Sequence, residues 1–301
     1  RSNARRSADG PLLNMTPRLR FAAALVAAGL ALSACGAGER ASEPATETVT
    51  ATHVITPSSL APSPVPAPVL EQLQPQLQAA VDAVVAQYGG TAELAVSDGR
   101  DAVGSPEQDP QVAWSTSKVP IAVAALRKDP SLLPVAESAI TASDNFAAET
   151  LWATVEPAEV EAVLREAGVD LPMNTVVLRP GFTAFGQTRW GTREQAVFAS
   201  NLRCVAGADE VLDMMRKVVP EQRYGLGVLP DVAFKGGWGP GDDGKYTVRQ
   251  LGLYNGYGIA LTVSPADGTY ATAQLMATDL TNAVLELQLG SPNPDCSEAG
   301  R

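Results

Sequence analysis

The apolar positions of the chain first follow a helical pattern, over residues 70–88. Residues 91–99, TAELAVSDG, then alternate between apolar and polar as a strand does, and they end in a turn. A second, weaker strand could occupy either VGSP at 103–106 or VAW at 112–114. Between residues 116 and 126 apolar side chains fall on all sides, which predicts a buried helix.

Further helical patterns follow in the middle of the chain, at 145–155, 157–167, 192–204 and 207–219. The pattern then changes to three strands and a closing helix, at 231–239, 246–255, 257–265 and 270–289. Strands at both ends with helices between them predict an α+β fold, an α/β/α sandwich. We expect one antiparallel sheet of N- and C-terminal strands, with a helical lobe inserted.

The N-terminal segment does not continue these patterns. Residues 1–14 are interpreted as an upstream extension, and residues 15–34 as a signal peptide with a basic start. The apolar run at 21–32 is too short to span a bilayer as a mature helix. Because the segment ends in Leu-Ser-Ala-Cys, it resembles a bacterial lipoprotein signal, in which Cys35 is lipidated. The alternative is an ordinary secretory signal with an incidental cysteine.

Residues 35–69 then read as the lipidated cysteine and a disordered tether rich in Pro, Ala and Thr. This arrangement predicts an exported protein anchored by lipid to the outer face of the cell membrane. The folded domain is expected over residues 70–301.

Charge and composition exclude several kinds of function. The net charge is −11, and the chain from Leu70 onward contains 16 basic and 29 acidic residues. Such a surface repels phosphate backbones, so we expect no nucleic-acid partner. The single histidine, His53, lies in the tether, so the domain has neither the imidazole base of a Ser-His-Asp triad nor a His/Cys zinc cluster. We expect no metal and no cofactor.

Two cysteines remain in the domain, Cys204 and Cys296. In an exported protein an even number of cysteines favours a disulfide. The alternative is two unrelated cysteines.

A serine three residues before a lysine opens the buried helix, in AWSTSKVPIAVAAL. A helix places Ser115 and Lys118 on one face, and its N-terminal dipole stabilises an alkoxide. Because burial disfavours the ammonium, the pKa of Lys118 falls and the amine can serve as the base. The alternative is that Ser115 caps the helix and Lys118 extends to solvent.

Two more motifs follow in order. Ser143-Asp144-Asn145 stands at a helix start, where it could supply a hydroxyl, a brace for the turn and an amide, or simply a cap. Lys235 is followed on a strand by Gly236 and Gly237, which indicates either a close approach to the backbone or an edge bulge.

Ser-x-x-Lys, Ser-Asp-Asn and Lys-x-Gly in this order resemble the penicillin-recognising serine enzymes, the class A β-lactamases and D-Ala-D-Ala peptidases. The resemblance covers residues 70–289. It implies that Ser115 is acylated, that Lys118 takes its proton, and that Ser143 and Lys235 pass a proton to the leaving nitrogen. It implies an oxyanion hole from the N–H groups of Ser115 and Trp238. The substrate, a β-lactam or a cell-wall peptide, is expected to contact Asn145, Gly237, Trp238 and Arg249, with Arg249 on its carboxylate.

The sequence departs from the family pattern in three places. Gly236 replaces a residue with a hydroxyl, and Ser115 and Ser143 lie only 28 positions apart. Residues 171–193 contain no acid, and the nearest match to the family's Glu-x-x-x-Asn is Asp170 with Asn174. Without that base, deacylation should be slow.

Two hypotheses therefore stay open. The first is an active serine hydrolase that forms an acyl-enzyme. The second is a catalytically degenerate envelope lipoprotein that binds a peptide or wall ligand in the same cleft. An unrelated fold with chance motifs is a third reading.

Overall fold

The two ends of the described chain meet in one five-stranded antiparallel sheet. The computed structural model describes residues 70–287, 289–290 and 296, so the predictions for residues 1–69 lie outside it. The strands run in the order β2-β1-β7-β6-β5. Their bounds are β1 Thr91–Ser97, β2 Ala102–Gly104, β5 Ala233–Pro240, β6 Tyr246–Tyr254 and β7 Tyr257–Ser264. The predicted α+β class and the assembly of the sheet from both ends of the chain are confirmed.

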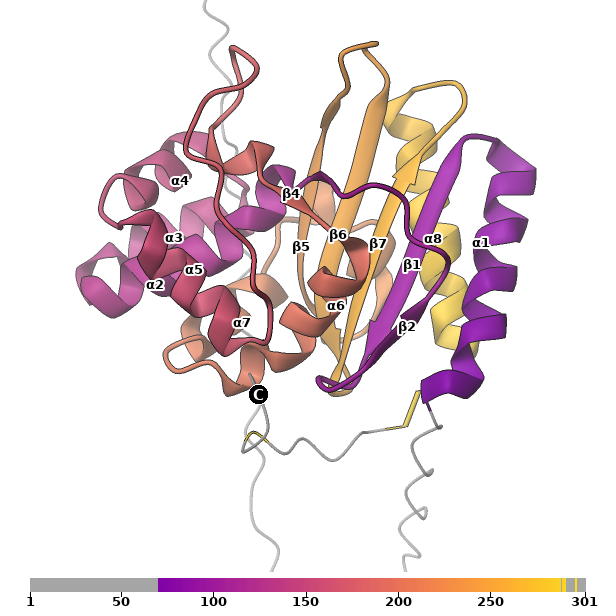
Figure 1. Ribbon diagram of the computed structural model, residues 1–301, viewed down its shortest axis with the longest axis horizontal. Helices are drawn as coiled ribbons and strands as arrows, with labels where there is room; N and C mark the ends of the chain where they lie inside the picture. The colour runs from indigo at the N-terminus through magenta and orange to yellow at the C-terminus, as the bar shows by residue number, and fades with distance from the viewer. Residues whose placement is uncertain (1–69, 288, 291–295, 297–301) are drawn as a thin grey trace, which may run out of the picture. The chain divides into compact units, whose positions relative to one another are not determined.

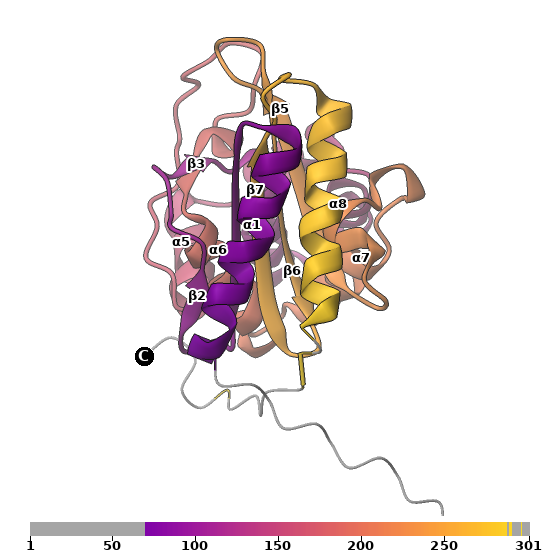
Figure 2. The ribbon, with the colours of Figure 1, turned by 90° about the vertical axis from the view of Figure 1, so that its right-hand side faces the viewer.

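Two helices, α1 (Gln74–Tyr88) and α8 (Tyr270–Glu286), lie side by side over one face of the sheet (Figure 2). Helix α1 ends at Gly89, whose φ of +66° a glycine adopts without strain. Apolar side chains of both helices and of the sheet form one core, which includes Leu77, Val81, Val84, Ile259, Leu261, Met276 and Leu280.

The other face carries α6 (Thr192–Asn201), which packs on β1 and β7. A helical lobe stands beside β5 (Figure 1). It consists of α2 Lys118–Lys128, α3 Leu133–Thr141, α4 Asn145–Trp152, α5 Pro157–Glu166 and α7 Asp209–Arg216. Helix α2 is the centre of the lobe, since each of its residues 118–126 is buried, as the all-round apolar pattern predicted. The lobe thus brings the start of α2 next to strand β5.

Helix α3 is the main element that the apolar pattern missed. Its sequence, LPVAESAIT, has a proline near its first turn and buries only Ala136, Ala139 and Ile140. Two small alanines give only a weak apolar pattern, so the sequence did not predict this helix. Its stability comes mainly from packing against the rest of the lobe.

Each of the two alternatives for a weak second strand overlaps a short strand. Strand β2 overlaps residues 103–106, and β3 (Gln111–Val112) overlaps 112–114 and pairs with β4 (Arg189–Trp190) in a separate two-stranded sheet. Short 3-10 helices join the larger elements, at Leu70–Leu73, Trp114–Ser117, Pro130–Leu132, Phe185–Gln187, Leu202–Cys204, Pro220–Gln222 and Gly225–Val228.

The predicted disulfide between Cys204 and Cys296 is confirmed and links positions 92 residues apart. Within the described residues, no helix combines the length and apolar character needed to cross a membrane.

Candidate active site

Ser115 lies where the 3-10 helix over Trp114–Ser117 runs into α2. Its side chain is half-exposed, whereas the residues on both sides of it are buried. Trp114 has a φ of +49°, a left-handed conformation that a bulky residue adopts only when its surroundings impose it. The start of α2 also presents the positive end of the helix dipole to this serine. Ser115 therefore has the access and the electrostatic setting of a nucleophile.

The Lys118 side chain is buried, with 1% of its surface exposed, and it points to the turn that contains the second motif. Its Nζ donates to Ser143 O at 2.6 Å and to Asn145 Oδ1 at 2.8 Å, and it lies 3.4 Å from Ser143 Oγ. Among the hydrogen bonds of the described residues, none joins Lys118 to Ser115 Oγ. The amine is thus fixed one helical turn from the nucleophile by contacts to Ser143 and Asn145.

Burial lowers the pKa of Lys118 from 10.5 to about 8, because the ammonium loses its hydration. The negative charges of Asp144 and Glu149 act in the opposite direction and keep the pKa from falling further. A lysine with a pKa of about 8 is about one-tenth neutral at pH 7, far more than an ordinary lysine, so it can accept a proton.

Ser143 lies between two lysines. Its Oγ accepts a hydrogen bond from Lys235 Nζ at 2.9 Å and lies 3.4 Å from Lys118 Nζ, a weaker contact. Lys235 is fully buried and also donates to Gly236 O at 2.8 Å. Burial first, and the positive charge of Lys118 second, lower the pKa of Lys235 well below its usual value. Ser143 has a φ of +60°, so this hydroxyl is held in place by an unusual backbone conformation. The three groups form a path along which a proton can move.

Strand β5 approaches the nucleophile closely at its glycines. A Cβ added at Gly237 would lie 2.8 Å from the backbone nitrogen of Ser115, and one at Gly239 would lie 2.5 Å from the Trp114 ring. A side chain at either position would push the strand away from Ser115. Gly236 is different, because a Cβ there would meet its nearest atoms only at 3.8 Å. The close approach inferred for the Lys-Gly-Gly run therefore applies to Gly237.

Trp238 comes next on β5, and its half-exposed ring stacks on Tyr270, with ring centres 5.7 Å apart. Strand β5 is the edge of the sheet that faces the helical lobe. An edge strand leaves alternate backbone N–H and C=O groups without a sheet partner. This edge can therefore bind an extended substrate.

Asn145 is the first residue of α4 and is exposed, so its amide can reach a ligand while Oδ1 accepts from Lys118. Asp144 caps the helix by accepting from the N–H groups of Phe146 at 2.8 Å and Ala147 at 3.2 Å. Ser138 also donates to Asp144, at 3.0 Å. For Asp144 the structure thus shows the helix cap that the sequence left open as the alternative reading of this motif.

Arg249 does not take the position expected of a carboxylate-binding residue. It is fully buried, and its guanidinium donates to the backbone oxygens of Gln111 at 2.8 Å, Val112 at 3.2 Å and Trp190 at 2.8 Å. Burial lowers the pKa of Arg249 to about 10, opposed by the charges of Glu93 and Glu194. The structure corrects the sequence interpretation here: Arg249 attaches strands β3 and β4 to the main sheet, and its donors are not directed at a ligand.

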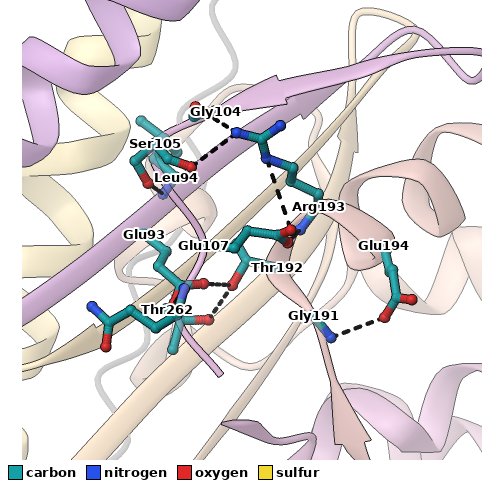
Figure 3. Close-up of polar contacts among 11 residues, drawn as sticks. Glu93, Leu94, Gly104, Ser105, Glu107, Gly191, Thr192, Arg193, Glu194 and Thr262 are labelled. Carbon is teal, nitrogen blue, oxygen red and sulfur yellow. Dashed lines mark hydrogen bonds and ion pairs between the residues drawn. The ribbon is translucent and has the colours of Figure 1, made fainter. Parts of the chain in front are cut away.

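Glu93, one of the two acids whose charge acts on Arg249, belongs to a polar cluster at the start of α6 (Figure 3). Glu93 accepts a short hydrogen bond from the Thr192 hydroxyl, which also contacts the Thr262 hydroxyl at 2.9 Å. In the strand register Gly237 pairs with Arg249, Arg249 with Thr262, and Thr262 with Glu93. One row of residues across four strands therefore connects this cluster to the strand beside Ser115.

The loop between α5 and β4 contains the segment without acids. Asn174 Nδ2 donates to Val176 O at 2.6 Å and Ala184 O at 2.7 Å, so this residue shapes the loop. Arg179 ties the loop to the β5–β6 hairpin through Pro240 O at 2.6 Å and the Asp242 carboxylate at 2.9 Å. Asp170 is exposed, and no hydrogen bond connects it to the site in the part of the chain described here.

A cavity of about 420 Å³ lies between this loop and the hairpin, lined by Gln111, Val112, Trp114, Leu178, Arg179, Phe182, Gln187, Arg189, Gly241, Asp242 and Thr247. None of the motif residues lines it, so it is separate from the side chains around Ser143.

Sequence reasoning overlooked Glu149, whose charge acts on Lys118. The signal was present, because Glu149 lies four positions after Asn145 on a predicted helix and therefore on the same face. No group of three or more His, Cys, Asp or Glu side chains suited to a metal ion occurs among the described residues.

No protein-family model and no curated protein matches the sequence. Solved structures do match, and they show that the chain has the fold of the class A β-lactamases. The resemblance to the penicillin-recognising serine enzymes is thus confirmed at the level of the fold.

Three solved structures illustrate the likeness. The TLA-3 extended-spectrum β-lactamase is 15% identical with a TM-score of 0.58, and the match covers 72% of this chain and 99% of that one. A class A β-lactamase from Mycobacterium abscessus is 17% identical with a TM-score of 0.56, covering 70% and 98%. A β-lactamase from Chitinophaga pinensis is 18% identical with a TM-score of 0.54, covering 69% and 97%. At these identities the likeness establishes the fold, and any activity must be argued from the site.

Proposed function

We propose that the protein is a serine hydrolase of the β-lactamase and penicillin-binding type, which forms an acyl-enzyme at Ser115. The substrate is a β-lactam or a cell-wall peptide. One observation carries this proposal: Ser143 Oγ lies between the amines of Lys118 and Lys235, both buried and both with lowered pKa values. Burying two lysines beside one hydroxyl costs stability, and a role in proton transfer accounts for their position.

In the acylation step, Ser115 Oγ attacks the carbonyl carbon and its proton passes to the neutral Lys118 amine. The backbone N–H groups of Ser115 and Trp238 stabilise the oxyanion, and Asn145 holds the substrate amide. When the carbon–nitrogen bond breaks, the Ser143 hydroxyl gives its proton to the leaving nitrogen. Lys235, or Lys118 in its ammonium form, returns a proton to Ser143, which balances the step.

Deacylation needs a base for the incoming water. The 171–193 loop supplies none, and Asn174, in the nearest match to the family motif, is engaged in shaping the loop. Unless a carboxylate of another element acts, release of the acyl group is slow.

The experiment is intact mass spectrometry of the protein after incubation with benzylpenicillin, with hydrolysis of a chromogenic cephalosporin measured in parallel. We expect a mass increase equal to the penicillin. Ser115→Ala should abolish the adduct completely, and Ser117→Ala, a neighbouring serine that donates to Trp114 O, is the matched control. The proposal fails if Ser115→Ala forms the same adduct as the parent protein.

The second candidate is the degenerate binding protein, favoured by the missing hydroxyl at Gly236 and by the inward position of Arg249. It predicts neither adduct nor turnover, together with reversible binding of a wall peptide that Asn145→Ala weakens. Calorimetric titration with a D-Ala-D-Ala peptide distinguishes it from the first.

We also propose that the chain is exported and anchored by lipid on Cys35. The signal-like segment 15–34 and the tether at 35–69 support this. Cys35→Ala should move the protein from the membrane fraction to the soluble fraction and abolish incorporation of labelled palmitate.

A further inference from the structure

Helix α4 carries a second polar residue on the face that presents Asn145. Glu149 lies four positions further along, and such pairs are neighbours on a helix surface, about 6 Å apart along the axis. Asn145 Oδ1 is 2.8 Å from Lys118 Nζ. Glu149 therefore lies one helical turn along α4 from the residue that contacts the amine of the proposed base.

The electrostatics agree with this placement, because the charge of Glu149 raises the pKa of Lys118 against the effect of burial. Asp144 acts on Lys118 in the same way, but its oxygens already accept from two backbone N–H groups and from Ser138. These bonds lower the pKa of Asp144, with the bond from Ala147 as the largest cause. Asp144 is thus a poor proton acceptor.

Glu149 is differently placed. Its side chain is exposed, and within the described residues it has no hydrogen bond or ion pair. Three glutamates on the neighbouring helix α5 are engaged: Glu159 with Lys128, Glu161 with the N–H of Met173, and Glu166 with Arg127. Glu149 is left as a carboxylate with unused oxygens, in contact with water and on the face of α4 that borders the site.

We propose that Glu149 is the general base of deacylation, in place of the acid that the 171–193 loop lacks. This inference rests on the proposed acylation of Ser115. The carboxylate takes a proton from a water molecule, whose oxygen attacks the ester carbonyl. The bond between that carbon and Ser115 Oγ then breaks, and the proton passes from Glu149 to Oγ. Water and ester become acid and free serine.

This assignment changes the expected kinetics. A loop without an acid predicts an acyl-enzyme that persists, whereas a base on α4 predicts turnover. A base supplied by a helix that also carries Asn145 keeps a fixed distance to the substrate-binding amide.

The test is Glu149→Gln, which keeps the shape of the side chain and removes its basicity. The full chain is mixed with benzylpenicillin, excess ligand is removed, and the adduct is followed by intact mass. We expect the adduct of the parent protein to decay, and that of Glu149→Gln to decay about 10²–10⁴-fold more slowly. Formation of the adduct should change far less.

Two further variants keep the result interpretable. Glu137→Gln is the matched control, since Glu137 is an exposed glutamate of the same lobe, on α3, and it should decay at the parental rate. Glu149→Asp keeps a carboxylate one carbon shorter and should restore part of the decay. If Glu149 had only a structural role, the shorter carboxylate of Glu149→Asp would not restore the rate of adduct decay.

The outcomes separate the two proposals. If the parent protein forms no adduct and hydrolyses no chromogenic cephalosporin, the proposed acylation fails and this inference fails with it. If the adduct forms but decays equally fast in Glu149→Gln, or never decays in the parent, acylation stands and the role of Glu149 is wrong.

Discussion

Lys235 and Arg249 are two fully buried cations on neighbouring strands of one sheet, and their surroundings differ in kind. The Arg249 guanidinium donates to three backbone oxygens, with the charges of Glu93 and Glu194 nearby. The Lys235 amine meets a hydroxyl, one carbonyl and the positive charge of Lys118.

The comparison teaches that burial alone does not identify a functional charge. Arg249 has partners that stabilise its charged form, as structural cations do. Lys235 has partners that leave the neutral and charged forms closer in energy, which suits proton transfer. Four predictions test this distinction.

The largest expected effect follows from Lys235→Met. The substitution removes the proton donor to Ser143, so we expect the rate of acylation by benzylpenicillin to fall about 10²–10⁴-fold. A methionine needs no hydration, so the free energy of unfolding should stay the same or increase. Lys245→Met changes an exposed lysine of the β5–β6 hairpin and should acylate normally. Stopped-flow or quenched mass spectrometry gives the rates, and a marked loss of stability in Lys235→Met would contradict the comparison.

Arg249→Met should show the opposite profile. One buried and two partly buried carbonyl oxygens lose their donor and Glu93 loses a nearby positive charge, so we expect about 3–5 kcal/mol less stability. Urea denaturation measures it. The control is Arg189→Met, an exposed arginine of β4 that donates to Pro110 O, with an expected loss below about 1 kcal/mol. If Arg249→Met were stable but failed to bind substrate, Arg249 would be a ligand residue after all.

The pH dependence of acylation reports on Lys118. Only its neutral amine accepts the Ser115 proton, and this fraction increases about tenfold for each pH unit until the pH reaches the pKa of about 8. The rate should therefore rise with pH and level off above about 8. A rate that is flat from pH 6 to 9 would mean that another group takes the proton.

The smallest effect concerns the cluster beside Arg249. Thr262→Val removes the hydroxyl that contacts Thr192, and we expect a loss of about 0.5–1.5 kcal/mol in the free energy of unfolding. Acylation should be unchanged, because this cluster supports the sheet at a distance from Ser143. A slower acylation in Thr262→Val would show that the row of residues across the sheet transmits strain to the nucleophile.

The sequence predicted the structure well where short motifs in a fixed order carry the functional side chains. The resemblance carried by the three motifs implied that Ser143 and Lys235 meet, and the structure joins Ser143 to Lys235 and to Lys118. Within the described part of the chain, no hydrogen bond joins the Ser115 hydroxyl to the Lys118 amine. The pairing of Cys204 with Cys296 was predicted from the expected export of the chain and the even number of cysteines.

It was a poor guide where the outcome depends on distant segments. Arg249 stands on a strand next to Lys235, as expected, but Gln111 and Trp190 cover its guanidinium, and no local pattern reveals this. The Ser-x-x-Lys motif predicted that Lys118 serves Ser115 as its base, with extension to solvent as the alternative. Its hydrogen bonds to Ser143 and Asn145 were not predicted, because they depend on the turn conformation at Ser143.

The left-handed backbone of Trp114 has a practical consequence for engineering. A bulky residue in this conformation costs roughly 1–3 kcal/mol, and the site adds two amines deprived of hydration. Selection of random variants for heat resistance alone should therefore enrich changes in this region first. Variants selected only for heat resistance are therefore expected to have lost the proposed hydrolase activity.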